Sequence, residues 1–268
     1  MGYTVAVLGE QRCPTLKFEL DDQVVGMSIF GRLLAVTAPL VAVTAGVPLV
    51  AAPAYAAPCP DVEVVFARGT FEAPGIGATG QAFVDSLRSR AGGRTVDVYA
   101  VNYPASFDFA TAADGVIDAS NRVVTMATNC PDTQIVLGGF SQGAAVAAYI
   151  TEDAIPEGYT PPPGMTGPMP PSVADNVAAV ALFGKPSSGF LQMIYTGAPP
   201  ISVGSRYGAK TLDLCIPEDP VCSPTGRDNA AHGGYALTGM TDRAAEFAVR
   251  NLPRHGSEQP VDLAAGPR

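Results

Sequence analysis

A G-x-S-x-G pattern at residues 139–143 constrains the fold more than any other feature, because it lies between two segments of opposite character. The apolar run at residues 135–137 predicts a short buried strand, and the alanine-rich segment at residues 144–150 has good helix propensity. Glycines on both sides of a strand-to-helix turn allow its middle residue a strained conformation that lifts the side chain clear of the sheet. The pattern therefore predicts Ser141 as a nucleophile, although a non-catalytic turn lined by glycines would show the same sequence pattern.

The rest of the chain alternates strand-like and helix-like segments. Strands are expected over residues 62–67, 96–101, 135–137, 177–183 and 211–214, and helices over residues 81–90, 110–127, 144–150 and 232–251. This alternation predicts a single-domain fold of the α/β class, with three α/β/α layers around a central, mainly parallel five-stranded sheet. Ligands of such sheets bind at the carboxyl ends of the strands, which is where Ser141 is expected.

Residues 33–50 are almost wholly apolar and are followed by Ala54-Tyr55-Ala56, a small-x-small pattern. This is typical of a secretory signal peptide, which we place at residues 27–57 with translation starting at Met27. A membrane anchor is the alternative interpretation, but the prolines and the small-residue end favour cleavage. We therefore expect a secreted protein, extracellular or associated with the cell wall, that is not stably inserted in a membrane.

The signal peptide divides the chain. Residues 1–26 carry acidic groups where a positive region is expected, and they are predicted to be a mis-annotated or disordered extension. Residues 58–252 are predicted to form the folded domain, in which prolines and glycines over residues 154–172 indicate a surface loop insertion. The polar tail over residues 253–268 is expected to be disordered.

The net charge of −9 and the pI near 4.6 argue against nucleic acid or an anionic membrane surface as a partner. We expect a monomer without metal or organic cofactor. One alternative is a nucleotide-binding enzyme, because Gly75–Gly80 matches G-x-G-x-x-G. Gly75 lies eight residues beyond Ala67, too far for the tight turn, and Asp97 falls within a strand. These positions favour a flexible loop.

Signal cleavage leaves an even number of cysteines, which in an exported protein predicts disulfides. Three connectivities are possible, and we favour the local pairs Cys59–Cys130 and Cys215–Cys222. Zinc is the alternative, but the cysteine spacings do not suit a structural site and the chain has only two histidines.

A nucleophilic serine needs a histidine base. His255 lies in the polar tail, so His232, which follows the last expected strand, is the base by elimination, and it fits the chain order Ser…Asp…His. The orienting acid is less defined. A ring closed by Cys215–Cys222 would fix Asp219 rigidly, which favours it, and Asp213 looks structural, but Glu218 and Asp228 remain open.

Residues 58–250 resemble the cutinase family, in particular the secreted cutinase-like esterases of actinobacteria. The motifs that match are Ala67-Arg-Gly-Thr70, Gly139-Phe-Ser-Gln-Gly143 and Cys215-Ile-Pro-Glu-Asp-Pro-Val-Cys222 followed by His232. The proline-rich insertion and the tail depart from compact fungal members of that family.

The resemblance implies an α/β hydrolase that hydrolyses carboxylic esters of the fatty-acyl or lipid type. It implies Ser141 as nucleophile, Asp219 as acid and His232 as base, with an oxyanion hole from Gln142 and Thr70. Residues 189–195 either line a pocket for an aliphatic chain or pack as a loop or helix over the sheet. A second interpretation is an exported binding or antigenic protein that has lost turnover.

Overall fold

The structure, a computed structural model, describes residues 58–254. The predicted extension (1–26) and the predicted signal peptide (27–57) lie outside the described residues, and so does the predicted tail from residue 255 onward. Nothing that follows depends on those segments.

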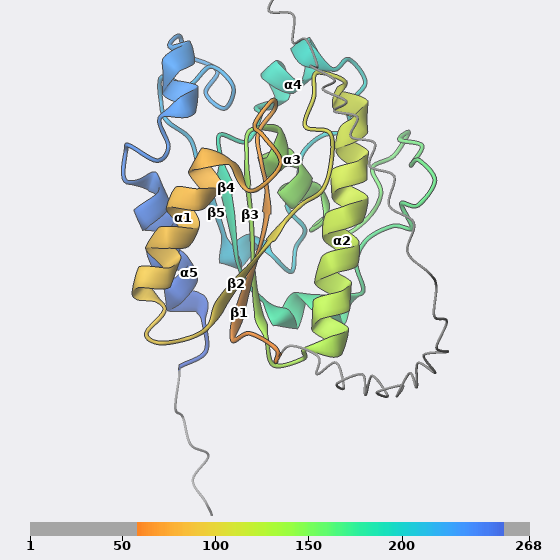
Figure 1. Cartoon of the computed structure of the whole chain (residues 1–268). Helices are drawn as coiled ribbons and strands as arrows, with labels where there is room; N and C mark the ends of the chain where they lie inside the picture. The colour runs from red at the N-terminus through yellow and green to blue at the C-terminus, as the bar shows by residue number, and fades with distance from the viewer. Residues whose placement is uncertain (1–57, 255–268) are drawn as a thin grey trace, which may run out of the picture. The chain divides into compact units, whose positions relative to one another are not determined.

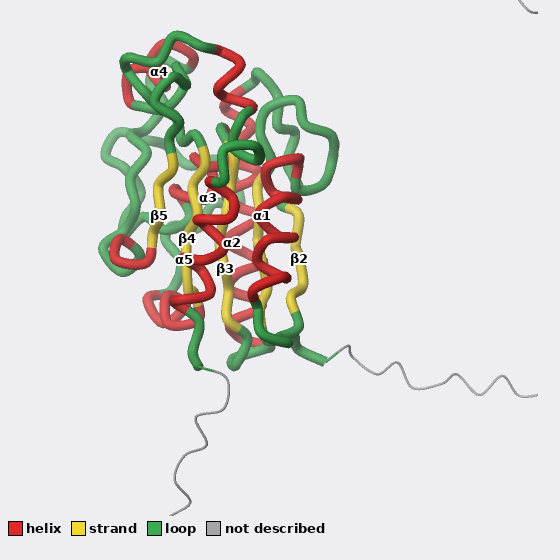
Figure 2. The backbone as a smooth tube through the Cα atoms, turned by 90° about the vertical axis from the view of Figure 1, so that its left-hand side faces the viewer, coloured by secondary structure: helices red, strands yellow, loops and turns green. Residues whose placement is uncertain are grey.

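The centre of the fold is a sheet of five parallel strands in the order β2-β1-β3-β4-β5 (Figure 2). The strands are β1 (Val62–Ala67), β2 (Val96–Ala100), β3 (Gln134–Phe140), β4 (Val177–Phe183) and β5 (Thr211–Leu214). The predicted five-stranded sheet is therefore confirmed. Strand β3 lies in the middle and is buried along almost its whole length, so the residue that follows it starts from a rigid support.

Helices cover both faces of the sheet, which confirms the three-layer prediction (Figure 1). The helices α1 (Gly77–Arg90) and α5 (Met240–Asn251) lie on one face, and α2 (Ala112–Asn129) and α3 (Gln142–Tyr149) lie on the other. The short helix α4 (Ser188–Ile194) lies beyond the carboxyl ends of the strands. Short 3-10 segments complete the secondary structure, at Phe109–Thr111, Pro171–Asn176, Gly208–Lys210 and Asn229–Gly233.

The prediction of one continuous helix over residues 232–251 is wrong in its first part. His232 lies in the 3-10 segment Asn229–Gly233, and α5 begins only at Met240. The residue before α5, Gly239, has a left-handed conformation with a φ of 72°, which a helix interior does not allow. The histidine is therefore held by a separate turn and not by the helix.

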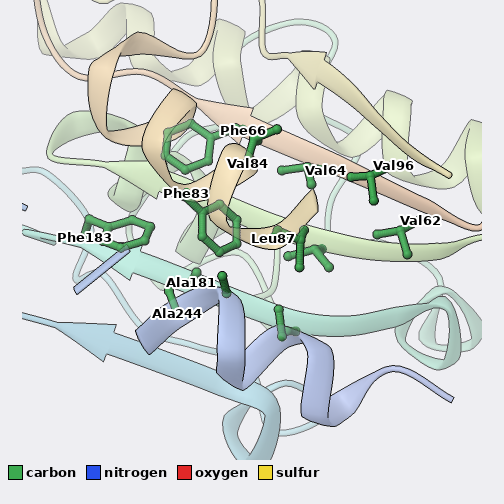
Figure 3. Close-up of a cluster of buried hydrophobic side chains, with 14 of the residues drawn as sticks. Val62, Val64, Phe66, Phe83, Val84, Leu87, Val96, Ala181, Phe183 and Ala244 are labelled. Carbon is green, nitrogen blue, oxygen red and sulfur yellow. The ribbon is translucent and has the colours of Figure 1, made fainter. Parts of the chain in front are cut away.

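Aromatic side chains join the sheet to the helices on the α1 side (Figure 3). The ring centroid of Phe66 on β1 lies 6.2 Å from that of Phe83 on α1 and 6.3 Å from that of Phe183 on β4. All three side chains are fully buried. Burial of large apolar groups on both faces makes the sheet a fixed frame for the loops at its carboxyl edge.

Both favoured disulfides are present. Cys59–Cys130 links the start of the described chain to the end of α2, and Cys215–Cys222 closes a small ring after β5. Each crosslink restricts the unfolded chain and so stabilises the fold. Among the described residues, no helix combines the length and apolar character needed to cross a membrane.

Candidate active site

Ser141 lies at a sharp turn between β3 and α3. It has a φ of 56° and a ψ of −119°, a conformation that non-glycine residues rarely adopt. Its N–H donates to the carbonyl oxygen of Phe183 at 2.8 Å, which fixes the turn to β4. A side-chain carbon at Gly139 would overlap the carbonyl of Gly143, and one at Gly143 would overlap the carbonyl of Ala67. Both glycines are therefore required by close backbone approach.

Gly143→Ala is expected to lower the free energy of unfolding by about 3 kcal/mol, because the new methyl group must push α3 away from β1. Gly189→Ala is the matched control, since an added carbon there meets no atom within 4 Å and alanine favours the helix α4. Urea unfolding of both variants measures the difference. Equal stabilities would contradict the required close approach at Gly143.

Ser141, His232 and Asp219 meet at the carboxyl edge of the sheet although they are far apart in the sequence. His232 Nε2 lies 2.8 Å from Ser141 Oγ, and His232 Nδ1 lies 2.8 Å from Asp219 Oδ2. Both distances are those of hydrogen bonds. The imidazole is partly exposed and the carboxylate is fully buried. The ring of Phe140 packs against the imidazole at a centroid distance of 4.9 Å.

Of the four acidic residues that the sequence offers, the structure brings Asp219 to His232. Asp213 forms an ion pair with Lys185 at 3.3 Å, and the Asp228 carboxylate accepts the N–H of Ala230. The side chain of Glu218 is exposed. Within the Cys215–Cys222 ring, the N–H of Asp219 donates to the carbonyl of Ile216, which turns the carboxylate inward.

Tyr235 is a site residue that sequence reasoning missed. Its hydroxyl donates to Asp219 Oδ2 at 2.7 Å, the same oxygen that faces His232, while Asp219 Oδ1 accepts the N–H of Val221 at 2.8 Å. Burial and the hydrogen bond to Asp219 raise the pKa of Tyr235 far above its ordinary value. The hydroxyl is therefore held as a donor to Asp219. Nothing in the spacing of Tyr235 from His232 signals this contact.

Thr70, Gln142, Ser141 and His232 line one cavity. Gln142 is the first residue of α3, and the first N–H groups of a helix have no acceptor within it. The Gln142 side chain points elsewhere, since its Nε2 donates to the carbonyl of Ser106 at 3.1 Å. Both predicted oxyanion residues thus lie at the cavity that Ser141 lines.

Two charged side chains that the sequence did not single out hold the Thr70 loop. The buried guanidinium of Arg68 donates to the carbonyl oxygens of Tyr103 at 2.6 Å and Glu72 at 2.8 Å. The Glu72 carboxylate accepts the N–H groups of Gly69 at 2.7 Å and Ala78 at 2.9 Å. The loop that carries Thr70 is therefore fixed at both ends.

Within the described chain, the non-glycine residues with positive φ are Phe71, Ala105 and Ser141. The N–H of Phe71 donates to the carbonyl of Ala105 at 2.7 Å, which joins the Thr70 loop to the loop after β2. All three strained residues thus lie in or beside the candidate site. Backbone strain of this kind persists only where the surrounding structure enforces it.

Glu72 also bears on the nucleotide alternative. Its carboxylate lies at the start of α1, where a pyrophosphate would have to bind, and a side-chain carbon at Gly77 would overlap it. The carboxylate of Glu72, which is half-buried, repels a phosphate at this point. Packing thus explains Gly77, which lies against Glu72, and Gly80, which lies against Phe66, while Gly75 has a φ of 133°.

The cavity beside Ser141 has a volume of about 570 Å³. Residues 189–195 contribute to it through α4, whose Phe190, Leu191 and Ile194 side chains line the wall. The segment is therefore a helix that lines the pocket, and it does so beyond the carboxyl ends of the strands instead of lying over the sheet. Among the described residues, no cluster of three or more His, Cys, Asp or Glu side chains could hold a metal ion.

Comparison with known proteins identifies relatives along the whole described domain. The sequence model of the family described as cutinase matches residues 58–252. Carboxylesterase Culp1 of Mycobacterium tuberculosis (strain ATCC 25618 / H37Rv) is 48% identical over 230 residues, which cover 85% of this chain and 96% of the relative. Phospholipase Culp4 of the same strain is 46% identical over 201 residues, covering 75% and 83%.

Solved structures give the same result. A Trichoderma reesei cutinase in complex with a C11Y4 phosphonate inhibitor has a TM-score of 0.54 at 31% identity, covering 74% of this chain and 78% of its own. An iodinated complex of acetyl xylan esterase has a TM-score of 0.58 at 26% identity, covering 73% and 100%. On the match over residues 58–252 and these relatives, the chain belongs to the cutinase family of α/β hydrolases.

Proposed function

We propose that the protein is a secreted serine esterase that hydrolyses carboxylic esters of fatty-acyl or lipid type through an acyl-enzyme. The observation that carries the proposal is the unbroken hydrogen-bond chain from Ser141 Oγ through the His232 ring to Asp219 Oδ2, with 2.8 Å at each step. This is the arrangement that a base-activated serine requires.

In the proposed mechanism, His232 Nε2 takes the proton of Ser141 Oγ as that oxygen attacks the ester carbonyl carbon. The tetrahedral intermediate collapses when the imidazolium gives the proton to the leaving alcohol. Water then repeats the sequence on the acyl-enzyme, with His232 again as base, and releases the carboxylic acid. Asp219 holds the ring in the required tautomer and stabilises its cation.

We assign the oxyanion hole to the N–H of Gln142 and to the N–H and hydroxyl of Thr70. Donors fixed before the reaction stabilise the developing negative oxygen, and each is worth on the order of a hundredfold or more in turnover. The fixed Thr70 loop supports this role, because Arg68 and Glu72 hold it without help from a substrate.

The apolar cavity and the relatives support the substrate class. Side chains such as Val116, Ile117, Phe190, Leu191 and Ile194 line the cavity next to Ser141, which suits an aliphatic chain. The names of the relatives include a carboxylesterase, a phospholipase and a cutinase. An acetylated sugar would leave this apolar wall without a partner. Both disulfides support export to an oxidising compartment.

The proposal is tested by incubating the purified protein with p-nitrophenyl esters and, separately, with an alkyl p-nitrophenyl phosphonate. We expect ester hydrolysis and stoichiometric loss of activity, with mass spectrometry locating the label on Ser141. A binding or antigenic protein that has lost turnover would give neither result. Saturable NAD binding without ester hydrolysis would instead favour the nucleotide alternative.

Tyr235→Phe is expected to lower kcat about tenfold and the free energy of unfolding by about 2 kcal/mol, because Asp219 loses a buried hydrogen bond to a charged oxygen. KM should change little, since Tyr235 does not line the cavity. Steady-state kinetics and urea unfolding measure both effects. Tyr99→Phe is the control, because Tyr99 also donates to a carboxylate, that of Asp118, but away from the site. Equal kcat values for the two variants would contradict the positioning role.

A further inference from the structure

The cavity that opens at Ser141 runs along one face of α3. Gln142, Ala145 and Tyr149 all line it, and their spacing of three and four residues places them in one row on the helix surface. Ser141 and Tyr149 are eight residues apart, so the row extends about 12 Å from the serine at a rise of about 1.5 Å per residue. The cavity therefore extends along α3 from the candidate nucleophile to Tyr149, and this part of it is called the channel below.

Two further helices form the sides of this channel. Helix α2 contributes Val116, Ile117 and Ser120, which again follow helical spacing. Helix α4 contributes Phe190 and Ile194 from beyond the carboxyl ends of the strands. In Figure 1, α2 lies on the face of the sheet that carries α3, and α4 lies above the carboxyl ends of the strands.

The proline-rich insertion, residues 154–172, closes the remaining side. Ile155, Tyr159 and Met165 of this segment line the same cavity as Ser141. The insertion lies against α2, because a side-chain carbon at Gly164 would be 3.5 Å from Ile117 Cδ1. Its prolines limit the conformations of the backbone, so the segment forms a stiff wall although it has almost no regular structure.

The far end of the channel is polar. The Tyr149 hydroxyl donates to the carbonyl of Pro199 at 2.6 Å. Glu152, Tyr159 and Tyr195 line the same cavity as Tyr149. Burial and these neighbours raise the pKa of Tyr149 above its ordinary value. An aliphatic chain that reached them would remove water from polar groups without replacing their hydrogen bonds, at a cost in free energy.

The length of the channel sets the length of the chain that fits. Carbon–carbon bonds of about 1.5 Å at an angle of about 111° advance an extended chain by roughly 1.25 Å per carbon. A span of about 12 Å from the serine to Tyr149 therefore accommodates roughly ten carbons.

We propose that the insertion, through Tyr159 and Met165, determines the acyl-chain length that the enzyme accepts, with an optimum near ten carbons. Met165 supplies apolar contact along the chain, and Tyr159 closes the channel at its end. This inference rests on the proposed esterase function and names its substrate more narrowly.

The test is a series of p-nitrophenyl esters from acetate through butyrate, octanoate and decanoate to palmitate. For the unmodified protein, kcat/KM should rise to decanoate and fall at least tenfold at palmitate. Met165→Ala should lower the ratio of kcat/KM for decanoate to that for acetate about fivefold. Tyr159→Ala should raise the ratio of kcat/KM for palmitate to that for acetate at least fivefold. Pro163→Ala is the matched control, because Pro163 belongs to the insertion but does not line the cavity.

The outcomes separate this inference from the function on which it rests. If the protein hydrolyses acetate and butyrate but Met165→Ala and Tyr159→Ala keep the chain-length profile of Pro163→Ala, the insertion does not select the chain and the esterase function stands. If no ester is hydrolysed, the function itself fails. Labelling rates of the unmodified protein with ethyl, decyl and hexadecyl phosphonates give the same profile without any variant, and equal rates would also overturn the inference.

Discussion

Replacement of Ser141 by alanine is expected to abolish ester hydrolysis, with a loss in kcat on the order of a millionfold, because a methyl group cannot attack a carbonyl carbon. Removal of a serine nucleophile in other hydrolases costs about this much, and the residual rate comes from binding and the oxyanion donors. The side chain of Ser141 forms a hydrogen bond with the partly exposed His232, whose loss should change thermal unfolding little.

Ser89→Ala provides the comparison, since Ser89 lies on α1, exposed, on the opposite face of the sheet. It should retain full activity on p-nitrophenyl butyrate in the same assay. The phosphonate label should be lost in the Ser141 variant and kept in the Ser89 variant. If the Ser141 variant retained more than a few per cent of the activity, the acyl-enzyme proposal would be wrong.

Local patterns in the sequence account for most of the architecture. Strand β4 reads as an unbroken apolar run, Val177–Phe183, because both of its faces are buried under helices. The turn after β3 is equally readable, since only glycine fits at residues 139 and 143. Both signals depend on neighbours in the chain, and the structure confirms the elements that they predict.

The final helix shows where local patterns fail. The apolar periodicity over residues 240–249 predicts the core of α5, but the same pattern cannot show that His232 belongs to a separate turn. The turn is set by hydrogen bonds such as that from the N–H of Ala231 to the carbonyl of Asp228. Its position relative to Ser141 depends on contacts 91 residues apart in the chain.

The hydrogen bonds that hold the site join residues far apart in the chain, and no sequence pattern predicts them. Arg68 contacts Tyr103 across 35 residues, and Tyr235 contacts Asp219 across 16 residues. The insertion is similar, because its prolines predict a loop but not that the loop folds back over α2. A sequence pattern predicts the local conformation of a segment but not the segment against which it packs.

Asp219→Asn is expected to lower kcat about ten-thousandfold, the loss found when the orienting carboxylate of a serine hydrolase becomes an amide. Both oxygens of Asp219 accept hydrogen bonds, Oδ1 from Val221 and Oδ2 from His232 and Tyr235. An amide must therefore point its NH2 group at one of these donors. If it faces His232, the imidazole turns to the tautomer with Nε2 protonated, which cannot take the proton of Ser141.

The three other acids that the sequence offered are the natural controls. Asp213→Asn breaks a partly exposed ion pair with Lys185 that is worth less than about 1 kcal/mol, and Asp228→Asn keeps a side-chain oxygen to cap the turn before His232. Both variants, and Glu218→Gln, should keep kcat within about twofold of the unmodified protein, because none of these carboxylates contacts the imidazole. A larger loss of kcat in Asp228→Asn or Glu218→Gln than in Asp219→Asn would contradict the assignment of Asp219 as the orienting acid. The hydrogen bond between His232 Nδ1 and Asp219 would then not be the one that orients the base.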